Sequence, residues 1–119
     1  MVRKLFILLF GLLLAGCGAA EYESVSVDEA MELVKKSEVK VLDVRTPEEY
    51  KGGHIPGSEL IPLQVLGGMA ENLDKDEDYL IVCRSGNRSR QASELLASKG
   101  FRVLNMEGGM NAWTGEIEQ

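Results

Sequence analysis

Hydrophobic residues in this chain form short apolar runs, separated by segments in which several recur at helical spacing. The short runs have the length of strands and lie at residues 40–44, 60–63, 79–82 and 102–105, and an alternating segment at 24–27 predicts a short first strand. The intervening segments, some with apolar residues three or four positions apart, predict helices near residues 27–34, 46–51, 66–73, 89–99 and 110–113. Strands that alternate with helices favour an α/β fold, with a small parallel β-sheet covered by helices on both faces.

Individual residues indicate where some of these elements begin, end or lie in the sheet. At residues 46–49, threonine, proline and glutamate occupy positions that favour a helix N-terminus, and the glycine pair at 52–53 ends this helix. Asp28 is the predicted N-cap region of the first helix. Pro62 lacks the N–H that a sheet ladder requires, so the strand at 60–63 is expected at a sheet edge.

The N-terminal segment has the layout of an export signal. A basic start at residues 1–4 precedes an apolar core at 5–14 and a small-residue cleavage site. The core is too short for a transmembrane helix, which needs about 20 residues. Leu-Ala-Gly-Cys at 14–17 resembles the bacterial lipoprotein box. That resemblance implies cleavage before Cys17 and acylation of this cysteine, with an ordinary cleavable signal as the alternative.

The chain therefore divides into three predicted parts. Residues 1–16 are the lipoprotein signal peptide, residues 17–23 are the lipidated N-terminus with a short tether, and residues 24–119 are one folded domain. The domain is expected to be exported and lipid-anchored on the periplasmic side of the bacterial cell envelope. Gly18, in place of aspartate, resembles the pattern sent to the outer membrane in Gram-negative bacteria.

The charge of the chain limits its partners. The formal net charge is −6, and removal of residues 1–16 would take away Arg3 and Lys4, leaving 11 basic residues against 19 acidic ones. Such a surface argues against nucleic acid, which requires a basic patch. It also argues against electrostatic membrane docking, so the expected membrane contact is the N-terminal lipid.

The loop at residues 83–89, Cys-Arg-Ser-Gly-Asn-Arg-Ser, connects an apolar run to the predicted helix at 89–99. Loop N–H groups and a helix N-terminus favour negative charge at this place. The same field favours the thiolate of Cys83, which is the nucleophilic form. Arg84 and Arg88 suit an anionic substrate, because a guanidinium binds two oxygens at once. Cys83 is therefore the candidate nucleophile, against the alternative of a buried, inert cysteine.

Other polar residues are expected in less reactive roles. If Cys17 is acylated, Cys83 has no intramolecular partner, and an unpaired thiol in an exported protein indicates reactivity. Asp43 is expected to accept hydrogen bonds near the loop or from Arg45, since a carboxylate touching the thiol would raise its pKa. His54, the only histidine, is expected in a turn with a satisfied imidazole. No second Cys or His is close by to form a metal site, and no cofactor is expected.

Four segments resemble the motifs of one known family, in that family's order, at residues 42–50, 53–58, 83–88 and 107–113. They contain Leu-Asp-Val-Arg with Glu-Glu-Tyr, Gly-His-Ile-Pro-Gly-Ser, Cys-x-x-x-x-Arg, and Glu-Gly-Gly-Met-Asn-Ala-Trp. The family is that of the rhodanese-like sulfurtransferases, in which alanine is more usual at the position of Ser58. The related cysteine phosphatases have one more residue between Cys and Arg, so the shorter loop resembles the sulfur-transferring kind. The glycines at 108–109 are expected to allow close backbone approach beside the loop.

The resemblance implies a single-domain rhodanese-type (thiosulfate) sulfurtransferase. A persulfide on Cys83 would carry sulfane sulfur from thiosulfate, or a similar small anionic donor, to a thiol or cyanide acceptor. Asp43 and Arg45 are expected as structural support, and the substrate-binding candidates are Arg84, Ser85, Gly86, Asn87 and Arg88. The alternatives are a cysteine phosphatase or arsenate reductase-like enzyme, and a non-catalytic sulfur carrier or anion-binding module. A dithiol redox protein is disfavoured because Cys-x-x-Cys is absent.

Overall fold

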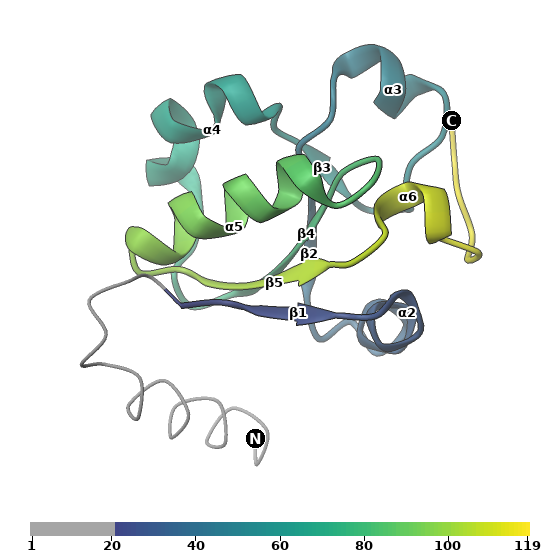
Figure 1. Cartoon of the computed structure of the whole chain (residues 1–119), viewed down its shortest axis with the longest axis horizontal. Coiled ribbons are helices and arrows are strands. Elements are labelled where there is room, and N and C mark those ends of the chain that lie inside the picture. Colours follow the sequence, from purple (N-terminus) through teal and green to yellow (C-terminus); the bar gives the residue numbers. More distant parts are fainter. Residues whose placement is uncertain (1–20) are drawn as a thin grey trace.

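The computed structural model describes residues 21–119, which form a five-stranded, all-parallel β-sheet with helices on both faces (Figure 1). The order across the sheet is β1-β5-β4-β2-β3. The strands are β1 (Glu23–Val25), β2 (Lys40–Asp43), β3 (Glu59–Leu60), β4 (Asp78–Val82) and β5 (Arg102–Met106). The helices are α2 (Val27–Lys35), α3 (Pro47–Lys51), α4 (Leu63–Met69), the short 3-10 helix η2 (Ala70–Asn72), α5 (Asn87–Ser98) and α6 (Gly109–Ala112). The predicted α/β class is confirmed.

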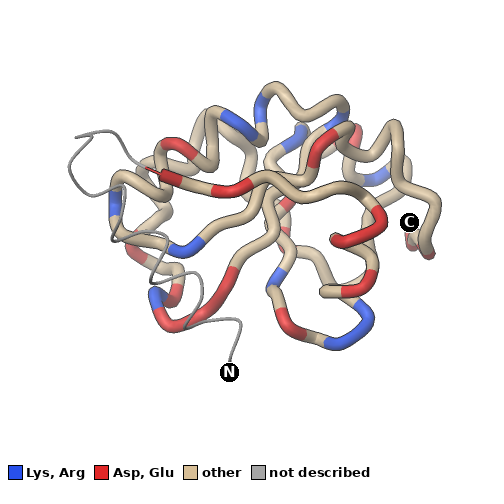
Figure 2. The backbone as a smooth tube through the Cα atoms, turned by 60° about the horizontal axis from the view of Figure 1, so that its bottom comes forward, with Lys and Arg blue, Asp and Glu red and all other residues tan. Residues whose placement is uncertain are grey.

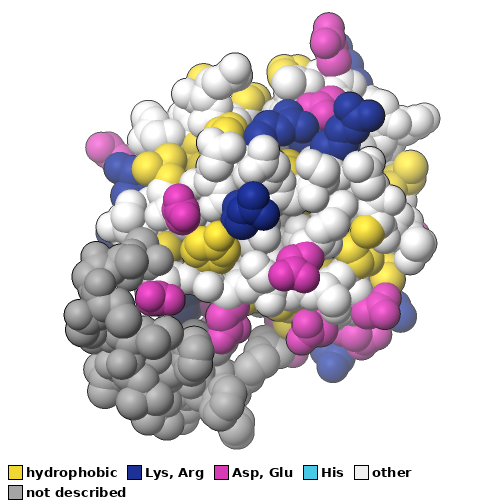
Figure 3. Space-filling model, in the orientation of Figure 1, with side chains coloured by type: hydrophobic (Ala, Val, Ile, Leu, Met, Phe, Trp, Pro, Cys, Tyr) yellow, Lys and Arg dark blue, Asp and Glu magenta, His cyan; other side chains and the backbone are white. Residues whose placement is uncertain are grey.

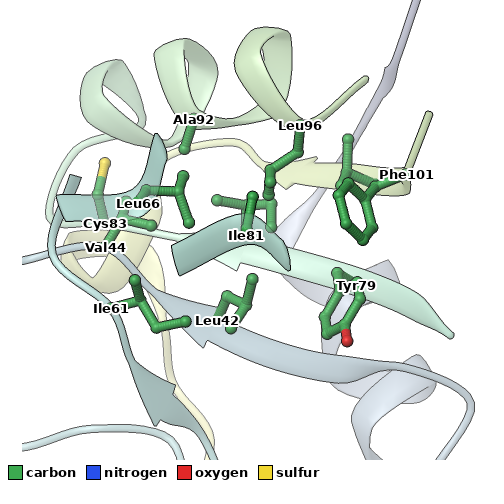
Figure 4. Packing of buried hydrophobic residues seen from close by; sticks show 12 residues of the cluster. Leu42, Val44, Ile61, Leu66, Tyr79, Ile81, Cys83, Ala92, Leu96 and Phe101 are labelled. Atoms are coloured by element: carbon green, nitrogen blue, oxygen red, sulfur yellow. The ribbon is translucent and has the colours of Figure 1, made fainter. Parts of the chain in front are cut away.

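Each face of the sheet is covered by one hydrophobic core. Cys83, just beyond β4, belongs to the first core together with side chains of α4 and α5 (Figure 4). The second core joins Leu80 and Val82 of β4 to side chains of α2 and α6. β4 is the central strand, and its residues from Tyr79 to Val82 are all buried. This burial on both faces explains the uninterrupted apolar run in the sequence.

Some helix N-termini differ from the sequence prediction. Ser26 Oγ accepts a hydrogen bond from Glu29 N at 3.1 Å and caps α2, so the prediction of Asp28 as the N-cap region is wrong. A serine followed three residues later by glutamate forms a capping box, and this pair prevails over the aspartate inside the first turn. α4 begins at Leu63, directly after Pro62, rather than at residue 66. Pro62 is the N-cap of this helix, where the N–H that proline lacks would make no intrahelical hydrogen bond.

The predicted start of α3 is confirmed. A strand lies at a sheet edge as predicted, but it covers residues 59–60 instead of 60–63, and Pro62 lies outside it. Thr46 Oγ1 accepts from Glu49 N at 3.2 Å, and the Glu49 carboxylate accepts from Thr46 N at 3.0 Å, so a capping box opens α3. β3 is a two-residue strand at one edge of the sheet. The capping box fixes the Glu49 carboxylate at the start of α3, near the end of the sheet where the strands have their C-termini.

The predicted signal peptide at residues 1–16 and the predicted lipidation site Cys17 lie outside the described residues. Within residues 21–119, no helix is both long enough and apolar enough to cross a membrane. Figure 2 shows acidic and basic residues interspersed along the described backbone.

Candidate active site

Cys83 lies directly after β4, at the carboxyl edge of the sheet, where parallel α/β folds bind ligands. The chain turns at Gly86, whose φ of +106° lies in the left-handed region that favours glycine. Gly86 serves as the N-cap of α5, which begins at Asn87. The predicted helix start at residue 89 is therefore two residues late, and the N-terminal N–H groups of α5 lie within the loop itself.

Three hydrogen-bonding groups converge on the sulfur of Cys83. Gly86 N lies 3.1 Å from Sγ, Ser89 N lies 3.3 Å away, and Ser89 Oγ lies 3.4 Å away. Both N–H groups donate to the sulfur, and the Ser89 hydroxyl donates to it when the sulfur is a thiolate. Cys83 and Ser89 are both fully buried. The sulfur thus lies in a cradle of donors that favour negative charge.

The cradle lowers the pKa of the thiol. Burial raises the pKa of Cys83, but hydrogen bonds from Ser89, Gly86 and Ser85 outweigh it, so the pKa lies below the ordinary value for cysteine. Hydrogen bonds to the charged form stabilise it, and a thiolate is the reactive species. The hydrogen bonds therefore favour the thiolate form of Cys83, and its role as the nucleophile stays a prediction.

Ser89 was not among the site residues inferred from the sequence. Its hydroxyl makes the largest contribution among the hydrogen bonds that lower the pKa of Cys83. As the third residue of α5, it lies in the first turn, where side chains face back toward the N-cap. The signal in the sequence was a serine six residues after the cysteine. It was missed because the helix was predicted to begin at residue 89, which did not place Ser89 inside its first turn.

Ser89→Ala removes the hydroxyl donor and retains the N–H donor. The pKa of Cys83 is expected to rise, because a hydrogen bond that stabilises the charged form is lost. The pH dependence of Cys83 alkylation by iodoacetamide, followed by mass spectrometry of the Cys83 peptide, measures this shift. Ser98→Ala is the matched control, since its hydroxyl bonds to Leu95 O near the far end of α5. A midpoint that does not move in Ser89→Ala would assign the stabilisation to the backbone alone.

Backbone hydrogen bonds connect α6 to the loop that begins at Cys83. Met110 N donates to Cys83 O at 2.7 Å, and Asn111 N donates to Arg84 O at 2.9 Å. Gly109 has a φ of +59°, and a Cβ at this position would lie 2.5 Å from the carbonyl carbon of Arg84. The predicted close approach at residues 108–109 is confirmed. These two hydrogen bonds fix the backbone of the loop at Cys83 and Arg84.

The arginines of the loop differ in their surroundings. Arg84 is exposed, whereas Arg88 is partly buried and donates from Nη1 and Nη2 to the two carboxylate oxygens of Glu49, at 2.8 and 2.9 Å. Arg90 donates to Asn87 Oδ1 at 3.2 Å. Figure 3 shows Lys and Arg side chains gathered in the region of α3 and the start of α5. A role of Arg84 and Arg88 in substrate binding stays a prediction.

Asp43 and Arg45 form a buried ion pair at the end of β2. Asp43 Oδ1 accepts from Arg45 Nε at 2.9 Å, and Oδ2 accepts from Arg45 Nη2 at 2.7 Å. Arg45 Nη2 also donates to Gly53 O at 2.8 Å, which ties the end of β2 to the segment after α3. The expected hydrogen bonding between Asp43 and Arg45 is confirmed.

His54 has partners on its imidazole, as the sequence predicted. Its Nδ1 lies 2.8 Å from Tyr50 O, its ring stacks on the Tyr50 ring, and its Nε2 lies 3.6 Å from Glu118 Oε1. Ser58 Oγ donates to Tyr50 Oη at 3.2 Å, so this hydroxyl supports the same turn. Within residues 21–119, no group of three or more His, Cys, Asp and Glu residues is arranged to hold a metal ion.

Comparison with known proteins agrees with this geometry. The family model described as "Rhodanese-like domain" matches residues 26–116. The Bacillus subtilis protein "Putative sulfurtransferase YtwF" is 40% identical over 100 residues, covering 84% of this chain and 89% of that protein. "Thiosulfate sulfurtransferase GlpE" of Pseudoalteromonas translucida is 34% identical over 93 residues, covering 77% of this chain and 89% of that protein. A crystal structure of a rhodanese-like domain protein from Staphylococcus aureus superposes with a TM-score of 0.75 at 39% identity, covering 81% of this chain and 96% of that one. The chain belongs to the rhodanese-like domain family.

Proposed function

We propose that the protein is a sulfurtransferase in which Cys83 takes sulfane sulfur from thiosulfate or a similar donor and passes it to a thiol or cyanide. The observation that carries this proposal is the convergence of Gly86 N, Ser89 N and Ser89 Oγ on Cys83 Sγ. These donors stabilise negative charge on Cys83 Sγ, which is the charge of the thiolate that attacks the sulfur donor and that is regenerated when the acceptor takes the sulfur. The sulfurtransferase names of the two relatives support the same activity.

Sulfur transfer proceeds in two steps, first to Cys83 and then to the acceptor. The Cys83 thiolate attacks the outer sulfur of thiosulfate, the S–S bond of thiosulfate breaks, and its electron pair leaves with sulfite. Cys83 then carries a persulfide anion. The acceptor attacks the terminal sulfur, and the electron pair of the persulfide bond returns to Cys83 Sγ, which regenerates the thiolate. The sulfur atom is exchanged between nucleophiles, so neither step needs an external oxidant, reductant or cofactor.

Mass spectrometry of the full-length protein after thiosulfate treatment tests the first step. One added sulfur atom is expected on the peptide that contains Cys83, and cyanide should remove it as thiocyanate. Multiple turnovers with excess donor and cyanide would support an enzyme, whereas a single transfer per protein would favour the sulfur-carrier alternative. If Cys83 remains unmodified while it still reacts with iodoacetamide, the proposed function is wrong.

The length of the loop leads to a second expectation, about substrate class. Cys83 and Arg88 are separated by four residues, one fewer than in the related cysteine phosphatases, and a smaller ring disfavours a tetrahedral phosphate. Side by side, thiosulfate turnover is expected to be measurable and aryl phosphate hydrolysis negligible. The opposite ranking would promote the phosphatase alternative over the sulfurtransferase.

We also propose that the protein is exported and lipid-anchored through Cys17. The support is the sequence of residues 1–17, with its basic start, short apolar core and Leu-Ala-Gly-Cys ending. Each methylene buried in a bilayer adds about 0.8 kcal/mol, so two or more acyl chains anchor a protein firmly.

Cys17→Ala is therefore expected to abolish fatty-acid labelling in a bacterial host while thiosulfate turnover persists, because Cys83 belongs to a separate domain. Metabolic labelling is the preferred measurement, since an uncut precursor could stay in the membrane through its apolar core. Wild-type protein without a fatty-acid label would contradict the anchor and leave the Cys83 chemistry untouched.

A further inference from the structure

We propose that Glu49 sets the donor specificity of the Cys83 site by neutralising Arg88, so that the site disfavours dianionic sulfur donors relative to monoanionic ones. This inference rests on the proposed sulfurtransferase function and names the donor class of that same site. The class is sulfane sulfur carried by a singly charged group, such as an alkyl thiosulfonate or a simple alkyl persulfide.

The ion pair joins two elements that are distant in the sequence. Arg88 lies in the first turn of α5, and Glu49 lies in the first turn of α3. Arg88 Nη1 donates to Glu49 Oε1 at 2.8 Å and Nη2 donates to Oε2 at 2.9 Å, in the bidentate geometry that is the strongest for these groups. The two side chains are about one quarter to one third exposed, at 24% and 31%. The pair is therefore ordered and lies near enough to the surface to meet a substrate.

Thr46 fixes the carboxylate from the other side. Glu49 Oε1 accepts from Thr46 N at 3.0 Å and from Thr46 Oγ1 at 3.1 Å, in addition to its bond from Arg88 Nη1. Hydrogen bonding to Arg88 is the largest cause that lowers the pKa of Glu49, to about 2, so the carboxylate is ionised at neutral pH. An anionic substrate that approaches Arg88 thus meets a guanidinium whose charge is already balanced by an anchored carboxylate.

Arg88 is part of the loop that surrounds the sulfur. It lies between Gly86 and Ser89, whose N–H groups donate to Cys83 Sγ at 3.1 and 3.3 Å, and hydrogen bonding to Glu49 and the negative charge of Cys83 both raise the pKa of Arg88. A change in the charge of the Glu49–Arg88 pair is therefore expected to change the field at the reacting sulfur. Because Coulomb energy is proportional to charge, a dianion gains twice as much as a monoanion from an unbalanced Arg88. Because Glu49 balances the charge of Arg88, this Coulomb attraction is weakened, and it is weakened more for thiosulfate than for a monoanionic donor.

Glu49→Gln removes the charge and keeps the geometry. Glutamine also closes a capping box, so Thr46 and α3 are preserved, and its amide oxygen can still accept from Arg88. We expect KM to fall about fourfold for thiosulfate and about twofold for methanethiosulfonate, in the range measured for partly exposed ion pairs. The two donors deliver the same sulfur and differ by one unit of charge. Glu48→Gln, an exposed neighbour in the same helical turn, makes the same change in net charge and should leave the ratio of the two KM values unchanged.

Alkylation of Cys83 gives a second readout that needs no sulfur transfer. In the full-length protein, the rate with anionic iodoacetate divided by the rate with neutral iodoacetamide reports the field at the sulfur. This ratio is expected to rise in Glu49→Gln and to stay constant in Glu48→Gln. A Glu49 that is only structural would give weaker catalysis with both donors and an unchanged alkylation ratio, which would overturn the proposal. A wild-type protein that takes sulfur from neither donor would instead overturn the proposed function, and the alkylation ratio would still decide the role of Glu49.

Discussion

Replacement of Cys83 by serine is expected to lower thiosulfate:cyanide sulfurtransfer by a factor on the order of 10³ or more, the scale seen when a nucleophile is removed from an enzyme. The hydroxyl of serine is not ionised at neutral pH and forms no persulfide. The buried donors Gly86 N and Ser89 N cannot compensate, because they stabilise an anion that serine does not supply. Thiocyanate formation with excess cyanide measures the loss.

The fold of Cys83→Ser is expected to survive, which makes the loss of turnover interpretable. Serine is isosteric with cysteine apart from the smaller atom, and its hydroxyl can accept from the same two N–H groups. Equal thermal unfolding of the variant and the wild-type protein is the control. A folded Cys83→Ser protein that retains substantial turnover would exclude a persulfide on this residue as the intermediate.

The architecture was readable from the sequence because the central strand is buried on both faces. The run at 79–82 has no polar interruption, and the structure places it in β4 at the middle of the sheet. An edge strand was expected around Pro62, but β3 ends at Leu60 and Pro62 is the N-cap of α4 instead. Helix starts were less certain: two apolar residues, Leu63 and Val65, extend α4 toward β3 without a cap signal.

The nucleophile was predictable and its closest hydroxyl partner was not. A cysteine between a buried strand and a helix is a local pattern, so Cys83 could be identified directly. The position of Ser89 depends on the start of α5, which follows from the left-handed turn at Gly86. That turn packs against α6: a Cβ on Gly86 would lie 3.4 Å from Gly108 N. Contacts between residues so far apart in the sequence are not visible in a local pattern.

The partner of Arg88 was concealed for a different reason. Residues 46–49 already explain Glu49 as part of a capping box, and the structure confirms that role. Nothing in the local sequence indicates that the same carboxylate also binds an arginine 39 residues away. A residue with one sufficient explanation can therefore carry a second function that only the fold reveals.

The buried pair of Asp43 and Arg45 gives the largest expected effect on stability. Arg45→Met should lower the free energy of unfolding by about 3–5 kcal/mol, because it leaves the Asp43 carboxylate buried without its counter-charge. Methionine fills much of the arginine volume, so a cavity is not the main cause. Urea unfolding of the full-length protein measures the effect, with a lower midpoint and an unchanged slope.

The double variant Asp43→Asn/Arg45→Met separates the unpaired charge from the other contacts of the arginine. Removing the carboxylate charge should recover a large part of the lost stability, since the main cost is a buried charge without a partner. Arg102→Ala is the exposed comparison, because its pair with Asp78 is more solvent-accessible and such pairs contribute about 1 kcal/mol or less. A double variant that is as unstable as Arg45→Met would place the cost in the lost hydrogen bond to Gly53 O, and thus in the segment that follows α3.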